Sequence, residues 1–305
     1  MKLVRHQVVT GLMVLGLAVL PLQAQTTPKN VPQKSYKVNT GRRAYSTSLR
    51  GDSPDSMNRW FEFRGGIRVY QIDGKIRPGD NGSSQLDLRD DLGLDGTEVG
   101  PQLDFEMQVG KRWYGRFSYA GTYFNGPTIT TTRTLIYQSP TATPNNPSRN
   151  PVTLAPGSVL QTKLDVDAFT ALTWYEAFRT DSFMIGPSVG VKALFFAETL
   201  TIRNITTGAN TVDETEHREV TPLVGLEARY QFNRNVYVGI SSAGFALDKY
   251  FYIGGQGYVG LDYDKTWGMR LGVDVDHITT TLTESSRYAA STTITAAFVQ
   301  GVYGF

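Results

Sequence analysis

The feature that most constrains the fold of this chain is a strict alternation of apolar and polar residues that recurs in many short segments. In residues 98–109, EVGPQLDFEMQV, Val99, Leu103 and Val109 fall on one face, and Asp104 and Glu106 fall on the other. Successive side chains of a β-strand point to opposite sides, so this period of two predicts strands with one apolar and one polar face.

Ten segments show the pattern, and they predict ten antiparallel strands at about 61–72, 98–109, 113–124, 163–175, 183–198, 220–232, 235–247, 251–263, 266–277 and 292–305. Short links at 110–112, 176–182, 233–235 and 264–265 alternate with long links at 74–97, 125–162, 199–219 and 278–291, and only the short link near 248–249 breaks the order. The alternation of link lengths predicts an up-and-down sheet with its short turns at one end, which is typical of a membrane-spanning β-barrel.

The residues before the first strand predict two further segments. In residues 1–24, Lys2 and Arg5 precede an apolar run from Val8 to Leu20, which is typical of a cleaved signal peptide. Residues 25–58 are polar and contain Pro28, Pro32 and Pro54 among them, so we expect a flexible periplasmic leader, followed by a barrel domain over 59–305.

One face of the predicted strands carries many charged residues, which we assign to the lumen of the barrel. They are Glu62, Arg64, Arg68, Asp104, Glu106, Arg116, Lys163, Asp165, Asp167, Lys192, Glu227, Arg229, Asp262, Arg270, Asp274 and Asp276. Periodicity alone also allows a soluble β-sandwich or a lipocalin-like barrel, in which this face would meet water and the apolar face would form the core.

The four tryptophans and the end of the chain favour the membrane barrel over the soluble folds. Trp60 begins the first strand, and Trp113, Trp174 and Trp267 fall beside short turns, so all four lie at the same end, as expected of an aromatic girdle at a membrane interface. At the other extreme of the sequence, the chain ends on alternating apolar residues that include Val299, Tyr303 and Phe305.

This ending resembles the C-terminal signature of bacterial outer-membrane β-barrels, through which the barrel-assembly machinery recognises the last strand. The whole pattern is similar to small porin-like, OmpA-like or OmpW-like barrels, with no subfamily distinguished. The resemblance implies an outer-membrane location, lipid and the assembly machinery as partners, and either a structural envelope role or a narrow pore for small solutes. The near balance of inward acids and bases favours a sealed lumen over a hydrated path, and the oligomeric state is left open.

Other functions are weaker interpretations of the same sequence. Long loops could serve a surface receptor or adhesin. An omptin-like enzyme would need a coupled Asp and His, but Asp276 and His277 are adjacent in a strand and should face opposite sides. A lipid-modifying enzyme would need a His and a Ser close in sequence on one face, and the residues that follow His277, Ile278 and Thr279, include no serine. Asp213, Glu214, Glu216 and His217 are expected in a solvated loop. We therefore expect no catalytic residue, no metal and no cofactor, and a net charge of +2 gives no reason to expect nucleic acid as a partner.

Two of the long links contain patterns of their own. LDLRDDLGLDG, in the link at 74–97, is expected to form a short amphipathic cap or to continue a strand, while a calcium loop is a weaker alternative because the spacing does not fit an EF-hand. The link at 125–162 is expected to extend its flanking strands; a separate hairpin within the membrane would raise the strand count to twelve.

Overall fold

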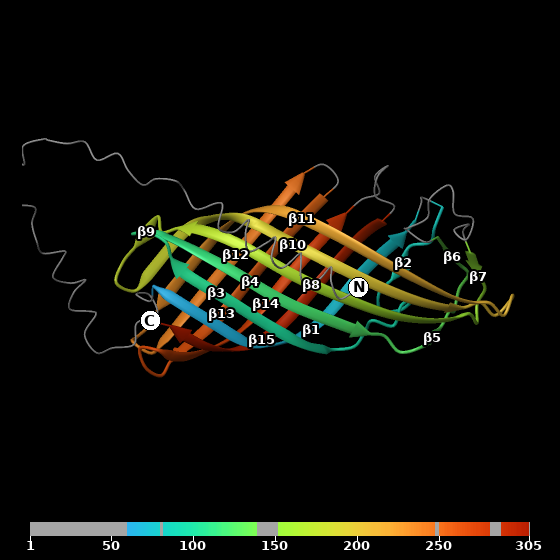
Figure 1. Ribbon diagram of the computed structural model, residues 1–305, viewed down its shortest axis with the longest axis horizontal. Coiled ribbons are helices and arrows are strands. Elements are labelled where there is room, and N and C mark those ends of the chain that lie inside the picture. Colours follow the sequence, from blue (N-terminus) through green and yellow to red (C-terminus); the bar gives the residue numbers. More distant parts are fainter. Residues whose placement is uncertain (1–59, 80–81, 139–151, 248–249, 281–287, 305) are drawn as a thin grey trace, which may run out of the picture. The chain divides into compact units, whose positions relative to one another are not determined.

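The computed structural model describes residues 60–79, 82–138, 152–247, 250–280 and 288–304 (Figure 1). The predicted signal peptide and leader, and Phe305 with them, lie outside the described residues. Within the described part of the chain, every regular element is a β-strand, and no helix is long and apolar enough to span a membrane.

Ten long strands form one closed antiparallel barrel in chain order. They are β1 (Phe61–Pro78), β3 (Glu98–Gln108), β4 (Trp113–Asn125), β8 (Val159–Tyr175), β10 (Phe183–Arg203), β11 (Asn210–Gln231), β12 (Val236–Leu247), β13 (Tyr250–Asp262), β14 (Trp267–Thr280) and β15 (Tyr288–Gly304). Each pairs with the next, and β15 pairs with β1 from Glu62↔Gly304 to Pro78↔Tyr288. Closure leaves no long unpaired edge, which is the condition for a sheet to cross a bilayer.

Five short strands lie at the ends of the barrel. They are β2 (Leu86–Asp87), β5 (Ile129–Thr130), β6 (Leu135–Tyr137), β7 (Val152–Leu154) and β9 (Phe178–Arg179). Strands β6 and β7 pair only with each other in a separate two-stranded sheet. Strand β5 pairs with the first two residues of β8 only, so the described residues of 125–162 add no further long strand to the wall, and the predicted count of ten is confirmed.

Several predicted links are instead parts of strands. Strand β10 continues to Arg203 and β11 begins at Asn210, so most of the predicted link 199–219 is a hairpin arm. The inward side chains at the end of β10 and the start of β11 pack against loop residues inside the barrel. This contact supports the sheet beyond the apolar part of its outer face.

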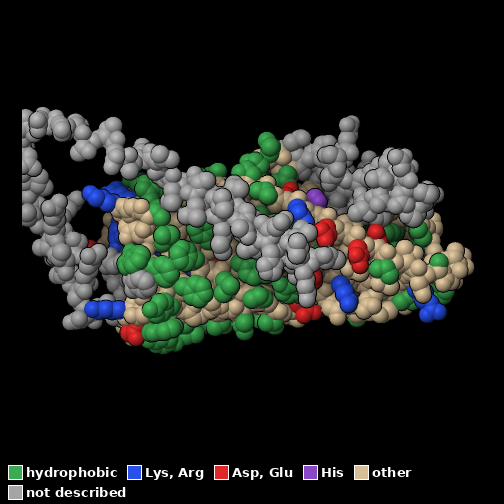
Figure 2. Space-filling model, viewed as in Figure 1, with side chains coloured by type: hydrophobic (Ala, Val, Ile, Leu, Met, Phe, Trp, Pro, Cys, Tyr) green, Lys and Arg blue, Asp and Glu red, His purple; other side chains and the backbone are tan. Residues whose placement is uncertain are grey.

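The barrel has two halves that differ in both faces. In the half near the short turns, the outward face is an apolar belt whose exposed members include Ile67, Leu103, Val189, Val224, Ile240, Val259 and Val273. Figure 2 shows hydrophobic side chains gathered over the left part of the wall, whereas the right part is mostly polar or charged. We call these parts the belt half and the loop half.

Aromatic rings fill part of the belt half by lying over glycines of the neighbouring strand. A Cβ at Gly260 of β13 would lie 2.0 Å from the ring of Tyr237, and one at Gly239 of β12 would lie 2.2 Å from the ring of Tyr258. Both tyrosines are buried on the inner face. Only glycine leaves space for a ring at van der Waals distance from the wall, so these positions fix how the lumen is filled.

Candidate functional site in the barrel lumen

The inner wall of the belt half carries a layer of buried charges that joins distant strands. We call it the ionic layer and define it as Glu62, Arg64, Glu106, Arg116, Glu227, Arg229 and Arg270, all at most 6% exposed. Its members come from β1, β3, β4, β11 and β14. Inward strand positions thus place basic and acidic side chains at one level of the lumen.

Glu106 is the centre of this layer. It accepts a hydrogen bond from Arg116 Nε at 2.8 Å, another from Arg64 Nη2 at 3.2 Å, and a third from Arg229. Strands β3 and β11, which carry Glu106 and Arg229, are separated by three strands along the shorter arc of the wall. Their contact therefore crosses the lumen.

Two further links complete the ionic layer. Arg116 Nη2 donates to Glu227 Oε2 at 2.8 Å, and Arg270 Nη2 donates to Glu62 Oε2 at 2.8 Å. The Arg270 guanidinium also lies 4.5 Å from the centroid of the Tyr258 ring. Charges removed from water are tolerated when they are paired and hydrogen-bonded, as these are.

A second cross-lumen contact lies above the ionic layer. Lys192 of β10 donates to Asp276 Oδ2 of β14 at 2.7 Å and to the Tyr252 hydroxyl at 2.8 Å, and that hydroxyl donates to Asp276 Oδ1 at 2.5 Å. Arg68 pairs with Asp274 at the same level. A cavity of about 120 Å³ borders these pairs, and its lining combines charged side chains with small residues such as Ala120, Ala168 and Ala243. A polar cavity of this size holds several water molecules.

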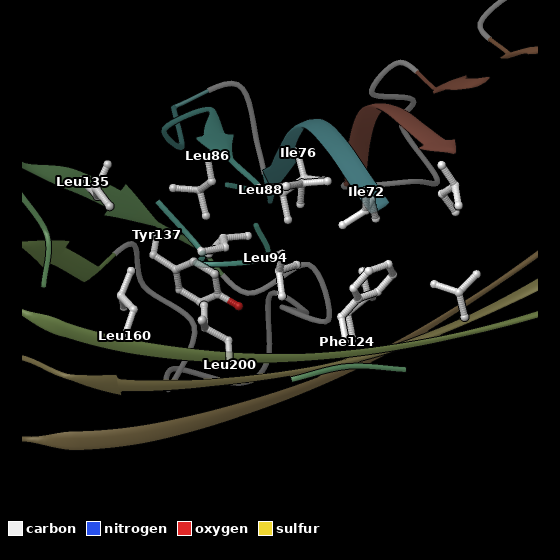
Figure 3. Packing of buried hydrophobic residues seen from close by; sticks show 14 of the residues in the cluster. Ile72, Ile76, Leu86, Leu88, Leu94, Phe124, Leu135, Tyr137, Leu160 and Leu200 are labelled. Atoms are coloured by element: carbon white, nitrogen blue, oxygen red, sulfur yellow. The ribbon is translucent and has the colours of Figure 1, made fainter. Parts of the chain in front are cut away.

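The lumen of the loop half is closed by apolar side chains instead. Leu86, Leu88, Leu92 and Leu94, from the segment between β1 and β3, are at most 2% exposed and pack against the wall (Figure 3). We call these four residues the outer plug. The wall beneath and around it is apolar too, and it includes Ile72, Ile76, Leu160, Leu164, Leu200 and Ile202.

Backbone bonds and one ion pair hold the outer plug in place. Leu88 N donates to Gly74 O at 3.0 Å, and Leu94 N donates to Leu88 O at 2.8 Å, closing a compact turn. Arg133, from the segment between β5 and β6, pairs with Asp91 at 2.5 Å and also donates to Gln85 O at 3.1 Å. The segment LDLRDDLGLDG therefore forms an amphipathic cap, which is one of the two structures expected from the sequence.

A small group of ionisable residues faces the outer plug from the wall. Glu198 of β10 and His217 and Glu219 of β11 line a cavity of about 30 Å³ together with Leu88 and Leu92. His217 Nε2 lies 3.8 Å from Glu219 Oε2. Burial, reinforced by the negative charge of Asp213, raises the pKa of Glu198 to about 7.

The structure places most of the charged residues assigned to the lumen on the inner face. Thirteen of the sixteen lie there: Glu62, Arg64, Arg68, Asp104, Glu106, Arg116, Lys192, Glu227, Arg229, Asp262, Arg270, Asp274 and Asp276. The ionic layer and the two pairs above it unite eleven of these, while Asp104 instead accepts from Gln300 Nε2 at 2.5 Å. Asp262 is buried at the end of β13.

The lumen assignment was wrong for Lys163, Asp165 and Asp167 of β8. These residues alternate with Leu164 and Val166, which are buried inside the barrel, so their own side chains point outward. Asp167 accepts a hydrogen bond from the Tyr119 hydroxyl at 2.9 Å on that outer face. The error arose because the charged face was taken to be the inner one everywhere, whereas the loop half reverses that polarity.

The girdle assignment was wrong for Trp174. Its side chain is 1% exposed and stacks inside the barrel on Tyr114, with ring centroids 4.2 Å apart. Trp60, Trp113 and Trp267 are 47–56% exposed at the short-turn end. Trp174 shares its face of β8 with the inward Leu164 and Leu172, so parity along the strand was the signal that could have identified it.

The remaining predicted residues lie as follows. Val299 and Tyr303 point outward on β15, and the Tyr303 ring lies 4.8 Å from that of Trp267. Asp276 points inward, whereas His277 Nδ1 lies 2.9 Å from Thr293 Oγ1 on the outer face, so the adjacent Asp and His are not coupled.

The loop assignment of the other His-containing segment was wrong. Asp213, Glu214, Glu216 and His217 lie on β11, where Asp213 and His217 are half-buried and Glu214 and Glu216 are exposed. Sequence reasoning also missed Glu198, whose inward position follows from its parity with Leu200. A single acid within an otherwise apolar inner face was the available signal.

Comparison with known proteins identifies the fold. No protein-family model and no curated protein sequence matches the chain. The outer-membrane protease OmpT from Escherichia coli is 11% identical, with a TM-score of 0.51, and the match covers 84% of this chain and 98% of OmpT. The chain therefore has the fold of bacterial outer-membrane β-barrels.

Two other solved structures are similar over most of their length at lower TM-scores. The toluene transporter TodX from Pseudomonas putida is 11% identical, with a TM-score of 0.33, covering 82% of this chain and 90% of TodX. The attachment invasion locus protein Ail from Yersinia pestis is 6% identical, with a TM-score of 0.29, covering 78% and 97%.

Proposed function

We propose that the protein is an outer-membrane barrel with an occluded lumen and a structural role in the envelope. The ionic layer carries this proposal, because Glu106 contacts arginines from three strands and its bond to Arg229 spans the lumen. A porous barrel needs a continuous hydrated path, whereas here the described lumen residues form an ionic layer below and an apolar plug above.

The location rests on the outer surface of the barrel. An apolar belt exposed to solvent across a closed sheet would be unfavourable in water, whereas in lipid it is the expected arrangement. Trp60, Trp113 and Trp267 at one end of this belt are suited to a headgroup interface. We expect the boiled and unboiled protein to migrate differently in a detergent gel, and equal migration would argue against a stable barrel.

Conductance in planar bilayers tests the occluded lumen. The wild-type protein should give no steady current steps. Replacing both Glu106 and Arg229 by Ser removes one acid and one base from the centre of the ionic layer without changing the net charge. Combined with removal of the plug leucines, this double substitution should create steady currents.

The matched control replaces Glu216 and Arg218 by Ser, because this pair lies on the exposed face of β11 at 3.6 Å and does not obstruct the lumen. With the same plug change, it should remain silent. Steady currents from the wild-type protein would contradict the occluded lumen and favour a narrow pore for small solutes.

A surface-binding role is the second candidate function. Strands β10 and β11 extend beyond the belt and present a polar outer face that includes Thr201, Arg203 and Glu214. Such a wall outside the membrane is a surface that a soluble partner could reach. Loss of cell-surface binding after Arg203 and Glu214 are replaced, with barrel insertion intact, would support this role.

A further inference from the structure

The outer plug covers ionisable side chains that an apolar plug would not be expected to cover. Glu198 is an acid on the inner face of β10 between Phe196 and Leu200, which both face the same apolar interior. The cavity that it shares with Leu88 and Leu92 is lined mainly by aliphatic side chains. In such a place a carboxylate loses its hydration, so the protonated acid is favoured over the ionised one.

The groups that face Glu198 increase this cost. From β11 come Asp213, His217 and Glu219, and Asp213 accepts a hydrogen bond from the Tyr137 hydroxyl of β6. The cavity residues supplied by β1, β8, β14, β15 and the plug carry no charge, and among all described residues that line the cavity His217 is the only basic one. Among the described residues, the groups that face Glu198 therefore include two acids, Asp213 and Glu219, and one base, His217.

We propose that the outer plug is a pH-responsive lid, seated when Glu198 is protonated and released when Glu198 is ionised. The proposal goes beyond the occluded structural barrel, because it adds a conformational change confined to the loop half. Glu198 lies outside the apolar belt: its neighbour Ala197 is level with Asp165 and Glu216, which point outward into a polar surface.

The direction of the pH effect follows from proton linkage. The pKa of Glu198 is about 7 under the plug, against a value of 4.5 for a solvated glutamate. The plugged form thus binds more protons between these values, and its advantage is complete below about pH 4.5 and is lost as the pH rises through 7. A difference of this size corresponds to a change on the order of a hundredfold in the ratio of plugged to released forms.

The release would uncover the upper lumen without opening the barrel. The ionic layer in the belt half does not include Glu198 and is held by contacts of its own. The expected change is therefore a displacement of residues 86–94 away from the hairpin of β10 and β11.

Spin-label distances test the lid directly, since the chain contains no cysteine. Labels at Arg89→Cys on the plug segment and Thr206→Cys at the hairpin tip replace two exposed residues. In the full-length protein in lipid, the distance distribution should be single and narrow at pH 5.5. A longer, broader component should appear at pH 8.5, with a midpoint near pH 7.

Two variants decide the cause. Glu198→Gln keeps the shape but cannot ionise, so its distribution should stay narrow at both pH values. Glu214→Gln removes an exposed acid from the outer face of β11 and should behave like the wild type. An unchanged wild-type distribution, or a Glu198→Gln variant that still shows the transition, would overturn the proposal.

Bilayer recordings of the same labelled samples keep this result separate from the proposed function. The ionic layer should prevent steady currents at both pH values. Currents at either pH would contradict the occluded barrel but would leave the measured movement of the lid unaffected.

Discussion

The belt half and the loop half of this barrel use opposite distributions of polarity with the same strands. In the belt half, β10 points Val189 outward and Lys192 inward; in the loop half, it points Thr201 outward and Leu200 inward. The outer face is apolar in the belt half, which suits lipid, and polar in the loop half, which suits water. Paired charges fill the lumen of the belt half, and leucines fill the lumen of the loop half. Buried charges are stable only beside partners, whereas buried leucines need only apolar contact.

The largest expected effect on folding comes from a substitution in the belt half that fills the space of a buried aromatic ring. Gly260→Val would place side-chain atoms in the ring of Tyr237, because even a Cβ would lie 2.0 Å from it. The wall and the buried ring cannot both keep their positions, so we expect the heat-modifiable folded band to be lost or greatly reduced.

Gly257→Val on the same strand is the control for this change. A Cβ at Gly257 would meet nothing within 4 Å, so this variant should fold with a heat-modifiable band like that of the wild type. Equal folding of the two variants would show that the ring does not lie against the wall.

An added charge on the outer face should lower the free energy of unfolding by several kcal/mol more in the belt half than in the loop half. Val189→Arg puts a guanidinium in the belt, where Val189 is 54% exposed, and should reduce the free energy of unfolding in lipid by about 2–4 kcal/mol. Thr201→Arg lies on the same face of the same strand beyond the belt, and it should change that free energy by less than about 0.5 kcal/mol.

Reversible urea unfolding in lipid vesicles measures both variants. Similar losses at the two positions would mean that the belt extends to Thr201, and similar small effects would mean that neither position meets lipid. Either outcome would remove the boundary between the halves.

The smallest expected effect concerns the ion pair that clasps the outer plug. The Arg133 side chain is 53% exposed, so its bond to Asp91 should contribute only about 0.2–1 kcal/mol. Arg133→Ala should therefore speed hydrogen exchange in residues 86–94 modestly at low salt. The strands of the belt half should keep their protection, and a global loss of protection would mean that the plug supports the whole barrel.

The alternation in segments such as 98–109 was enough to predict strands, their count and their order, because side-chain direction in a strand follows directly from position. The outward direction of Val299 and Tyr303 on the last strand follows in the same way from their alternate positions. These features are local or depend only on spacing, and the sequence by itself determined them.

Only the tertiary structure decided which face of each strand was the inner one in the loop half, and what filled the lumen. Lys163 and Glu198 show why: Lys163 alternates with the buried Leu164 and points outward, whereas Glu198 shares a face with the buried Leu200 and points inward. Periodicity gives the relative phase of neighbouring residues, but whether a face meets water, lipid or a plug depends on segments far away in the sequence. The ionic layer depends on closure of the barrel for the same reason, because Glu106 and Arg229 meet only after the wall has curved around to bring them together.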